Sequence, residues 1–111
     1  MDRFVHPDPS DVTLTAVLHA LSDPARRRIL RALVADAGAG GCGLACAAAA
    51  PPNLPRATMS NHYSVLRAAG LVRAERRGVE VIHTPRCAEM EQRFPGVVRA
   101  ILTAESDAAK S

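Results

Sequence analysis

Hydrogen-bonding side chains and arginines concentrate between residues 54 and 84 of this 111-residue chain. The small polar groups there that can bond base edges or phosphates are Thr58, Ser60, Asn61 and His62. The arginines there that can hold phosphates are Arg56, Arg67, Arg76 and Arg77. Residues 56–86 contain six arginines and two glutamates, a net charge of +4, whereas the whole chain carries only +3. Such clustering is typical of a surface that meets a polyanion.

The polar side chains fall on a predicted helix that runs from Pro55 to Ala69. Met59, Tyr63 and Leu66 recur along it at spacings of four and three residues, so they share one apolar helix face. The polar residues then occupy the other face and are free to meet a ligand. Gly70 follows the last periodic residue, as expected of a residue that ends a helix.

A basic hairpin is predicted directly after this helix. Residues 71–77 and 79–84 alternate as two strands around Gly78. Arg76 and Arg77 lie at the tip, which places two positive charges beside the polar helix. We call this hairpin the wing.

The remaining segments are predicted to be mostly helical. A first helix starts near Asp11 and a second runs from Pro24 to about Ala37, with Asp23 as its N-cap. After a glycine-rich break at residues 38–43, a short third helix is expected over residues 44–50. A last helix covers residues 87–104 and is divided or kinked at Pro95.

This order, ααααβ-βα, predicts a mainly α winged helix-turn-helix, in which the second helix of the motif enters the DNA major groove. We expect residues 11–105 to form the domain, residues 1–10 a flexible N-terminal tail and residues 106–111 a frayed C-terminus. Apolar stripes on the terminal helices, at residues 14–21 and 90–102, favour a homodimer through those helices.

Two separated motifs resemble the ArsR/SmtB family of winged-helix regulators. Residues 20–30, ALSDPARRRIL, are similar to the family's opening "ALSDPTRRRIL". Residues 58–72, TMSNHYSVLRAAGLV, resemble its recognition helix "TVSHHLKVLREAGLV". With the wing, the likeness covers about residues 14–104.

The resemblance implies a dimeric DNA-binding transcription regulator. The family usually represses, and a metal or another inducer usually releases the DNA. By position, Ser60 and His62 fall on polar positions of the recognition helix, and Asn61 stands where the family often has His. Arg76 and Arg77 fall on the wing. A homodimer of this kind binds double-stranded DNA at an inverted-repeat operator.

The sensing half departs from the family pattern. The thiol box "ELCVCDL" is absent, and its region here is GCGLACA, residues 41–47. The candidate metal ligands are Cys42, Cys46, Cys87, His6 and His19. Two thiolates cannot complete a tetrahedral zinc site, which needs four ligands. Two alternatives stay open: a mixed site for nickel or zinc at the dimer interface, or no direct sensing, with dependence on a separate sensor protein or on expression level. We rank both above an arsenite sensor, since arsenite is coordinated by about three thiolates.

Other classes of protein find less support. No glycine-rich phosphate loop, paired catalytic carboxylates or nucleophile–base spacing is present, so we do not expect an enzyme. No apolar run approaches the ~18 residues of a membrane span, and the N-terminus lacks a signal-peptide layout. A cytoplasmic protein with free thiols is expected. The main alternative function is a winged-helix module whose basic face binds an acidic protein.

Overall fold

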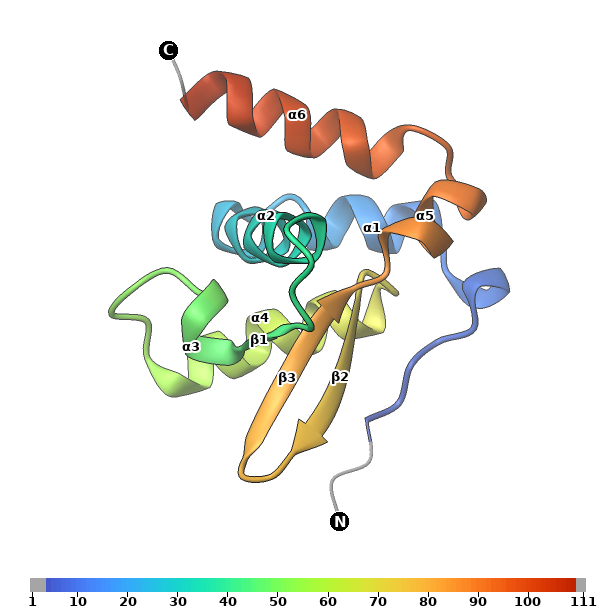
Figure 1. The fold of residues 1–111 in the computed structure, drawn as a ribbon. Helices are drawn as coiled ribbons and strands as arrows, with labels where there is room; N and C mark the ends of the chain where they lie inside the picture. The colour runs from blue at the N-terminus through green and yellow to red at the C-terminus, as the bar shows by residue number, and fades with distance from the viewer. Residues whose placement is uncertain (1–3, 110–111) are drawn as a thin grey trace.

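The structure is a computed structural model that describes residues 4–109. It confirms a mainly helical fold with a β-hairpin, the architecture of a winged helix-turn-helix (Figure 1). The elements in chain order are the 3₁₀-helix η1 (Pro9–Asp11), α1 (Leu14–Ala20), α2 (Pro24–Gly38), β1 (Leu44–Ala45), α3 (Cys46–Ala49), α4 (Arg56–Ala68), β2 (Val72–Arg77), β3 (Glu80–Pro85), α5 (Cys87–Arg93) and α6 (Val97–Ala109).

Local capping sets the starts of the first two helices. The Thr13 hydroxyl accepts a hydrogen bond from the Ala16 N–H at 3.1 Å, so α1 begins at Leu14 rather than near Asp11. The Asp23 carboxylate accepts from the Ala25 N–H at 2.8 Å, and Pro24 occupies the first position of α2. The predicted start of α2 is therefore confirmed.

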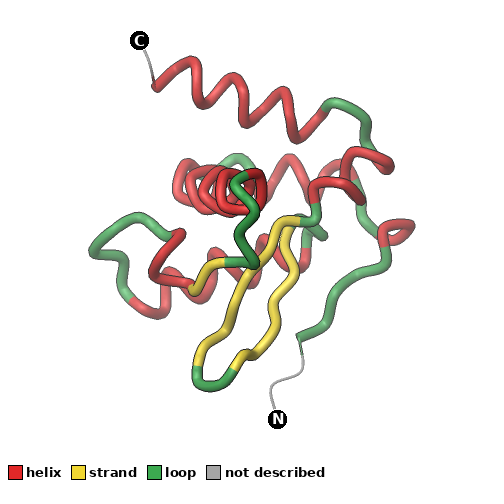
Figure 2. The backbone as a smooth tube through the Cα atoms, in the orientation of Figure 1, coloured by secondary structure: helices red, strands yellow, loops and turns green. Residues whose placement is uncertain are grey.

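The sheet has three antiparallel strands in the order β1-β3-β2. The predicted hairpin is confirmed, with Arg77 paired to Glu80 at its tip. The predicted helix over residues 44–50 is wrong at its start, because Leu44 and Ala45 pair with β3 as a two-residue strand. The helix that follows, α3, has only one turn, and residues 50–55 connect it to α4 (Figure 2).

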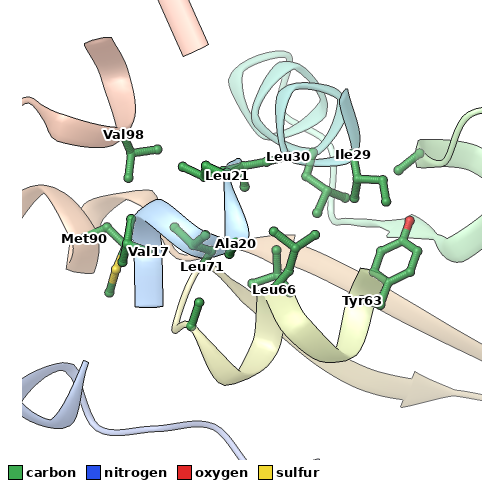
Figure 3. Close-up of a cluster of buried hydrophobic side chains, with 14 of the residues drawn as sticks. Val17, Ala20, Leu21, Ile29, Leu30, Tyr63, Leu66, Leu71, Met90 and Val98 are labelled. Carbon is green, nitrogen blue, oxygen red and sulfur yellow. The ribbon is translucent and has the colours of Figure 1, made fainter. Parts of the chain in front are cut away.

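One apolar core joins α1, α2, α4 and the start of β2. Most of its largest fully buried aliphatic side chains come from α2 and α4, and one precedes β2; they are Ile29, Leu30, Leu33, Leu66 and Leu71. Figure 3 shows part of this cluster. Tyr63 extends this core towards α3, where its hydroxyl donates to the Cys46 carbonyl at 2.8 Å. Met90 and Val98 close the core from α5 and α6. These buried contacts determine which face of α4 points into the core and therefore which face is exposed to solvent.

The C-terminal region is divided as predicted, with Pro95 lying between α5 and α6. The α6 helix extends to Ala109, and the fraying expected from residue 106 stays a prediction. The rest of that expectation, residues 110–111, lies outside the described residues. In Figure 1, α6 lies on the far side of α2 from the hairpin tip. Within the described residues, no helix is long and apolar enough to cross a membrane.

The N-terminal segment packs on the domain, which differs from the flexible tail expected for residues 1–10. The His6 ring Nε2 accepts a hydrogen bond from the Ala74 N–H at 2.9 Å. The Arg93 guanidinium donates to the Pro9 carbonyl at 3.2 Å. Residues 1–3 of the expected tail lie outside the described residues. In the described part, the His6 side chain thus accepts a hydrogen bond from one backbone N–H on the outer edge of β2.

Candidate nucleic-acid interface

Most of the polar side chains expected on the recognition helix lie on the exposed face of α4. Thr58, Ser60 and Asn61 are exposed, whereas Tyr63 and Leu66 on the opposite face are buried. This division follows the helical period, since residues three and four apart share a face. The exposed face therefore presents small hydroxyl and amide groups that can reach a neighbouring surface without steric obstruction.

The start of α4 is suited to an anion. Its N-cap residue is Pro55, and no side chain that the structure describes caps the helix there. The first N–H groups of a helix have no partners within the helix, and the helix dipole adds partial positive charge at this end. Arg56, which is exposed in the first turn, adds a full charge. A phosphate oxygen is the kind of ligand that such a helix start accepts.

The wing presents two exposed arginines at its tip. The Arg77 guanidinium is paired with Glu75 and donates to the Cys42 carbonyl at 2.9 Å. The Arg76 guanidinium lies 3.5 Å from the Val79 carbonyl. Each of the two arginines lies close to a backbone carbonyl, yet its side chain stays exposed to solvent. The wing is therefore held in place by the loop before β1, with its charges facing outward.

His62 does not lie where the sequence suggested, because its ring is buried at 7% exposure. Its Nδ1 is 3.4 Å from an Arg26 guanidinium nitrogen. Arg26 is itself buried and donates through Nε to the Ala20 carbonyl at 2.6 Å. The expectation that His62 joins the outward polar face is therefore wrong: the ring and Arg26 connect α4 to α1 and α2.

Arg67 also differs from the expectation of an open phosphate contact. Its guanidinium lies 5.0 Å from the centre of the Phe4 ring, in cation–π geometry. The side chain is half-buried under the N-terminal segment. Sequence reasoning missed this contact because residues 4 and 67 are far apart in the chain.

Two further arginines of the basic stretch share one acid, which offsets one of their two positive charges. Arg86 is buried and bonds the Glu89 carboxylate, and Arg73 pairs with the same carboxylate at 3.1 Å. Hydrogen bonding from Arg86 lowers the pKa of Glu89, which keeps that group ionised. Glu89 lies outside residues 56–86, so it offsets one of the positive charges counted there. Arg56, Arg76 and Arg77 are exposed at the candidate interface, and Arg77 is paired with Glu75.

The expected metal ligands are not brought together. Cys42 is exposed in the loop before β1, and Cys46 and Cys87 are half-buried on different helices. Burial raises the pKa of both the Cys46 and the Cys87 thiols, which disfavours the thiolate that a metal needs. His6 bonds the backbone of β2. In the part of the chain that the structure describes, no three His, Cys, Asp or Glu side chains are placed to hold a metal ion.

The structure instead pairs Cys46 with His83, which the sequence did not suggest. The Cys46 Sγ lies 3.8 Å from His83 Nδ1, and the imidazole stacks on the Tyr63 ring at 4.1 Å between centres. Burial, together with smaller contributions from the charges of Arg67 and His6, lowers the pKa of His83 to about 4. Among the described residues, Nε2 of this buried ring has no hydrogen-bond partner. The imidazole is therefore a neutral part of the core.

The exposed polar helix, the turn before it and the basic hairpin after it define a winged helix-turn-helix domain. This is a class of fold found in DNA-binding transcription regulators. In agreement, residues 21–75 match the protein family described as "Helix-turn-helix domain". The match runs from the end of α1 to β2 and so includes both helices of the motif. A comparison with curated proteins found no match.

Proposed function

We propose that this protein is a sequence-specific DNA-binding transcriptional regulator that acts as a homodimeric repressor. The observation that carries the proposal is the exposed face of α4, which offers Ser60 and Asn61 next to a helix start that no described side chain caps. Small polar groups on a helix suit the major groove, whose ~12 Å width admits one helix. A docking site for another protein would instead favour exposed aromatic or methionine side chains.

Within this interface we assign different tasks to different side chains. The Asn61 amide can form a bidentate pair with adenine, and Thr58 and Ser60 can bond base edges or phosphates. Arg56, Arg76 and Arg77 would hold phosphates on either side of the groove. His62 and Arg67 are left out of this set, because one is buried and the other lies under Phe4.

For the dimer we propose a surface on α1 and α6. Leu14 and Leu18 of α1 are 43% and 48% exposed, unusual for large apolar side chains. Leu18 lines a hollow of about 360 Å³ together with Ile101 and Ala104 of α6. A second copy related by a two-fold axis would cover this apolar surface and set two recognition helices about one DNA turn apart. The operator is then an imperfect inverted repeat, and its occupation would block transcription.

For sensing we propose that the chain does not use a thiolate-rich metal site. The three cysteines lie on separate elements, and two have thiols of raised pKa. A partner protein, or a weaker nickel or zinc site at the dimer interface, would then transmit the signal. Titration of the reduced protein with zinc, nickel and arsenite tests this. Sub-micromolar arsenite binding that is lost in a Cys42→Ser/Cys46→Ser/Cys87→Ser variant would contradict it.

The test of DNA recognition is selection from a pool of random duplexes at several salt concentrations. We expect the selected sequences to share an inverted repeat with half-sites about 10 base pairs apart. The affinity should fall steeply with salt, as phosphate binding releases counterions. A pool from which no sequence is enriched, together with tight binding to an acidic polypeptide, would favour the protein-interaction alternative.

A further inference from the structure

An open groove of about 1080 Å³ is lined by residues of α2, α5 and α6. In Figure 1, α2 and α6 lie on the side of the molecule away from the tip of the wing. The groove's apolar lining comes from both long helices and includes Ala32, Val34, Val98 and Leu102. These side chains are aliphatic. Small-molecule sites in proteins are typically about 300–1,000 Å³ and mostly apolar, with a few polar groups that fix orientation. The groove therefore has the size and lining of a ligand site.

Arginines supply the charge at this groove. Arg28 and Arg31 of α2 are three residues apart and so share one helix face, and Arg99 lies across from them on α6. In the part of the chain whose side chains the structure describes, none of these three arginines forms an ion pair. Glu91 is the one acid among the described residues that line the groove. Both of its carboxylate oxygens accept from the Gly96 N–H at 3.0 Å, at the start of α6, and the group keeps its negative charge.

The neighbouring arginines of α2 are engaged elsewhere and do not line the groove. Arg26 is buried against α1 and α4, and Arg27 pairs with Glu105 of α6 at 3.3 Å. The pair of Arg27 with Glu105 thus links α2 to α6. Arg28 and Arg31 line the groove beside these two helices. Guanidinium groups bind carboxylates through two parallel hydrogen bonds, which gives geometric selectivity as well as charge complementarity.

We propose that this groove binds an aliphatic carboxylate of the fatty-acid type as an effector of the regulator. The carboxylate would lie on Arg28 and Arg31, and the alkyl chain would lie along Val34, Val98 and Leu102. An alkyl chain fits better than an aromatic acid because the lining offers aliphatic contacts and no aromatic ring for stacking. This effector role rests on the proposed DNA-binding function, whereas the binding of the ligand does not.

The groove is separate from the surface proposed for the dimer. The dimer surface lies on the α1 side of α6, where Leu18 and Ile101 line the smaller hollow. The groove lies on the α2 and α5 side of the same helix. A second copy seated on α1 would therefore leave it accessible.

The groove is also connected to the DNA-binding elements. Its α2 wall belongs to the helix whose Ile29, Leu30 and Leu33 pack in the core with α4. Its α5 wall begins at Cys87, two residues after β3 ends. A ligand that moves α5 or α6 against α2 would thus act on both the recognition helix and the wing.

Calorimetric titration with dodecanoate, below its micelle concentration, tests the ligand. Dodecan-1-ol and dodecyltrimethylammonium serve as probes of equal chain length without the negative charge. We expect saturable 1:1 binding of dodecanoate, with affinity at least tenfold above that of either control probe. Equal binding of the alcohol or of the cation, or no binding of dodecanoate below millimolar concentration, would overturn the proposal.

Variants locate the site. Arg28→Gln/Arg31→Gln should weaken dodecanoate binding about tenfold or more, because charged hydrogen bonds are lost. Arg93→Gln is the matched control, since this exposed arginine of α5 bonds the Pro9 carbonyl outside the groove. Maleimide labelling gives an independent readout: dodecanoate should protect Cys87, which lines the groove, and leave exposed Cys42 unchanged. Unaltered affinity in the double variant, or equal protection of both thiols, would place the ligand elsewhere.

The DNA experiment separates the two proposals. Operator affinity of the wild type should change at least fivefold when dodecanoate saturates the groove, and the double variant should not respond. If the protein binds no operator yet binds dodecanoate, the proposed function fails and the ligand site stands. If it binds an operator with unchanged affinity in saturating dodecanoate, the effector role fails.

Discussion

Asn61 is the side chain of α4 best equipped to distinguish base pairs, because an exposed amide both donates and accepts hydrogen bonds. We predict that Asn61→Ala costs about 1–3 kcal/mol of binding free energy on the selected operator and little on random DNA. Fluorescence anisotropy with both duplexes measures this difference. Equal losses on the two duplexes would mean that Asn61 does not contact a base.

Arg56 should behave differently, since a phosphate contact carries no sequence information. Arg56→Ala is expected to weaken binding to operator and to random DNA alike. It should also reduce the slope of log affinity against log salt by about one ion. Comparison with Asn61→Ala makes the division of tasks testable, because a loss confined to the operator would assign Arg56 to base recognition.

His83 should make the stability of the fold depend on pH. Its pKa in the fold is about 4, because burial disfavours the charged ring, whereas the unfolded chain titrates near pH 6.5. Above pH 6.5 the ring is neutral in both the folded and the unfolded state, so the free energy of unfolding has its full value. Between about pH 6.5 and 4 the unfolded state binds the proton first, and the free energy of unfolding should fall by about 3 kcal/mol. Urea unfolding across this range measures the loss.

A His83→Leu variant provides the control for that titration. It replaces the ring with an apolar group, so the group that titrates and its unpartnered Nε2 are both removed. The dependence of stability on pH should be distinctly flatter than in the wild type. A smaller pH dependence should remain from His6, because burial lowers the pKa of that ring as well. An unchanged dependence would show that other groups cause the effect.

Buried polar residues were the hardest to predict from the sequence. The exposed places of Ser60 and Asn61 follow from the helical period. His62 stands three residues after Met59 and four before Leu66, so the same period puts it at the edge of the apolar face, which the expectation of a DNA contact overlooked. Its contact with Arg26 of α2, at 3.4 Å, does not follow from the period. Likewise, Glu89 neutralises Arg86 from beyond the stretch in which the charges were counted. Such pairings depend on tertiary structure, which local patterns do not contain.

At the scale of elements, segments with clear start and stop residues were predicted well. The α2 helix follows an aspartate cap and a proline, and the wing follows Gly70, so local chemistry alone defines them. Leu44 and Ala45 carry no comparable pattern. They become a strand because β3 lies alongside, and a two-residue strand has too few residues to show a period.

Gly70 should be the more sensitive of two turn glycines. Gly70 and Gly78 both have a positive φ, of 82° and 64°, so alanine at either site costs about 1–2 kcal/mol of strain. A Cβ at Gly70 would also lie 2.5 Å from a Val12 methyl, whereas nothing lies within 4 Å at Gly78. We predict that Gly70→Ala destabilises the fold by about 1–3 kcal/mol more than Gly78→Ala in thermal or urea unfolding. Equal losses would show that Val12 moves aside freely.

At the scale of the whole molecule, the exposed leucines of α1 provide a test of assembly. Leu18→Glu should leave the monomer stable, because the side chain is already 48% exposed, yet place a charge in the proposed two-fold interface. Ile101 is less suited to this test because it packs against the core. Sedimentation equilibrium should show a wild-type dimer and a Leu18→Glu monomer with much weaker operator binding.

Gln92→Glu adds the same charge at an exposed position of α5 and is the matched control. We expect this variant to remain dimeric. A wild type that is monomeric at micromolar concentration and still binds the operator fully would rule out the dimer.

The distribution of charge over the molecule also could not be predicted from the chain. The sequence placed the excess positive charge on α4 and the wing, but the fold pairs two of those arginines with Glu89. It also gathers Arg28, Arg31 and Arg99 around a separate groove. Residues distant in the chain supply each site, so only the tertiary structure reveals that the protein has two basic regions.

The hydrogen bond between His6 and Ala74 has a practical consequence for handling the protein. An uncovered outer strand offers its N–H and C=O groups to any other chain, which is a common route to aggregation. Here the N-terminal segment occupies a donor on the outer strand β2. Truncation before Pro7, or a bulky fusion at the N-terminus, should therefore lower solubility. An affinity tag at the C-terminus, on the opposite side of the molecule in Figure 1, should not.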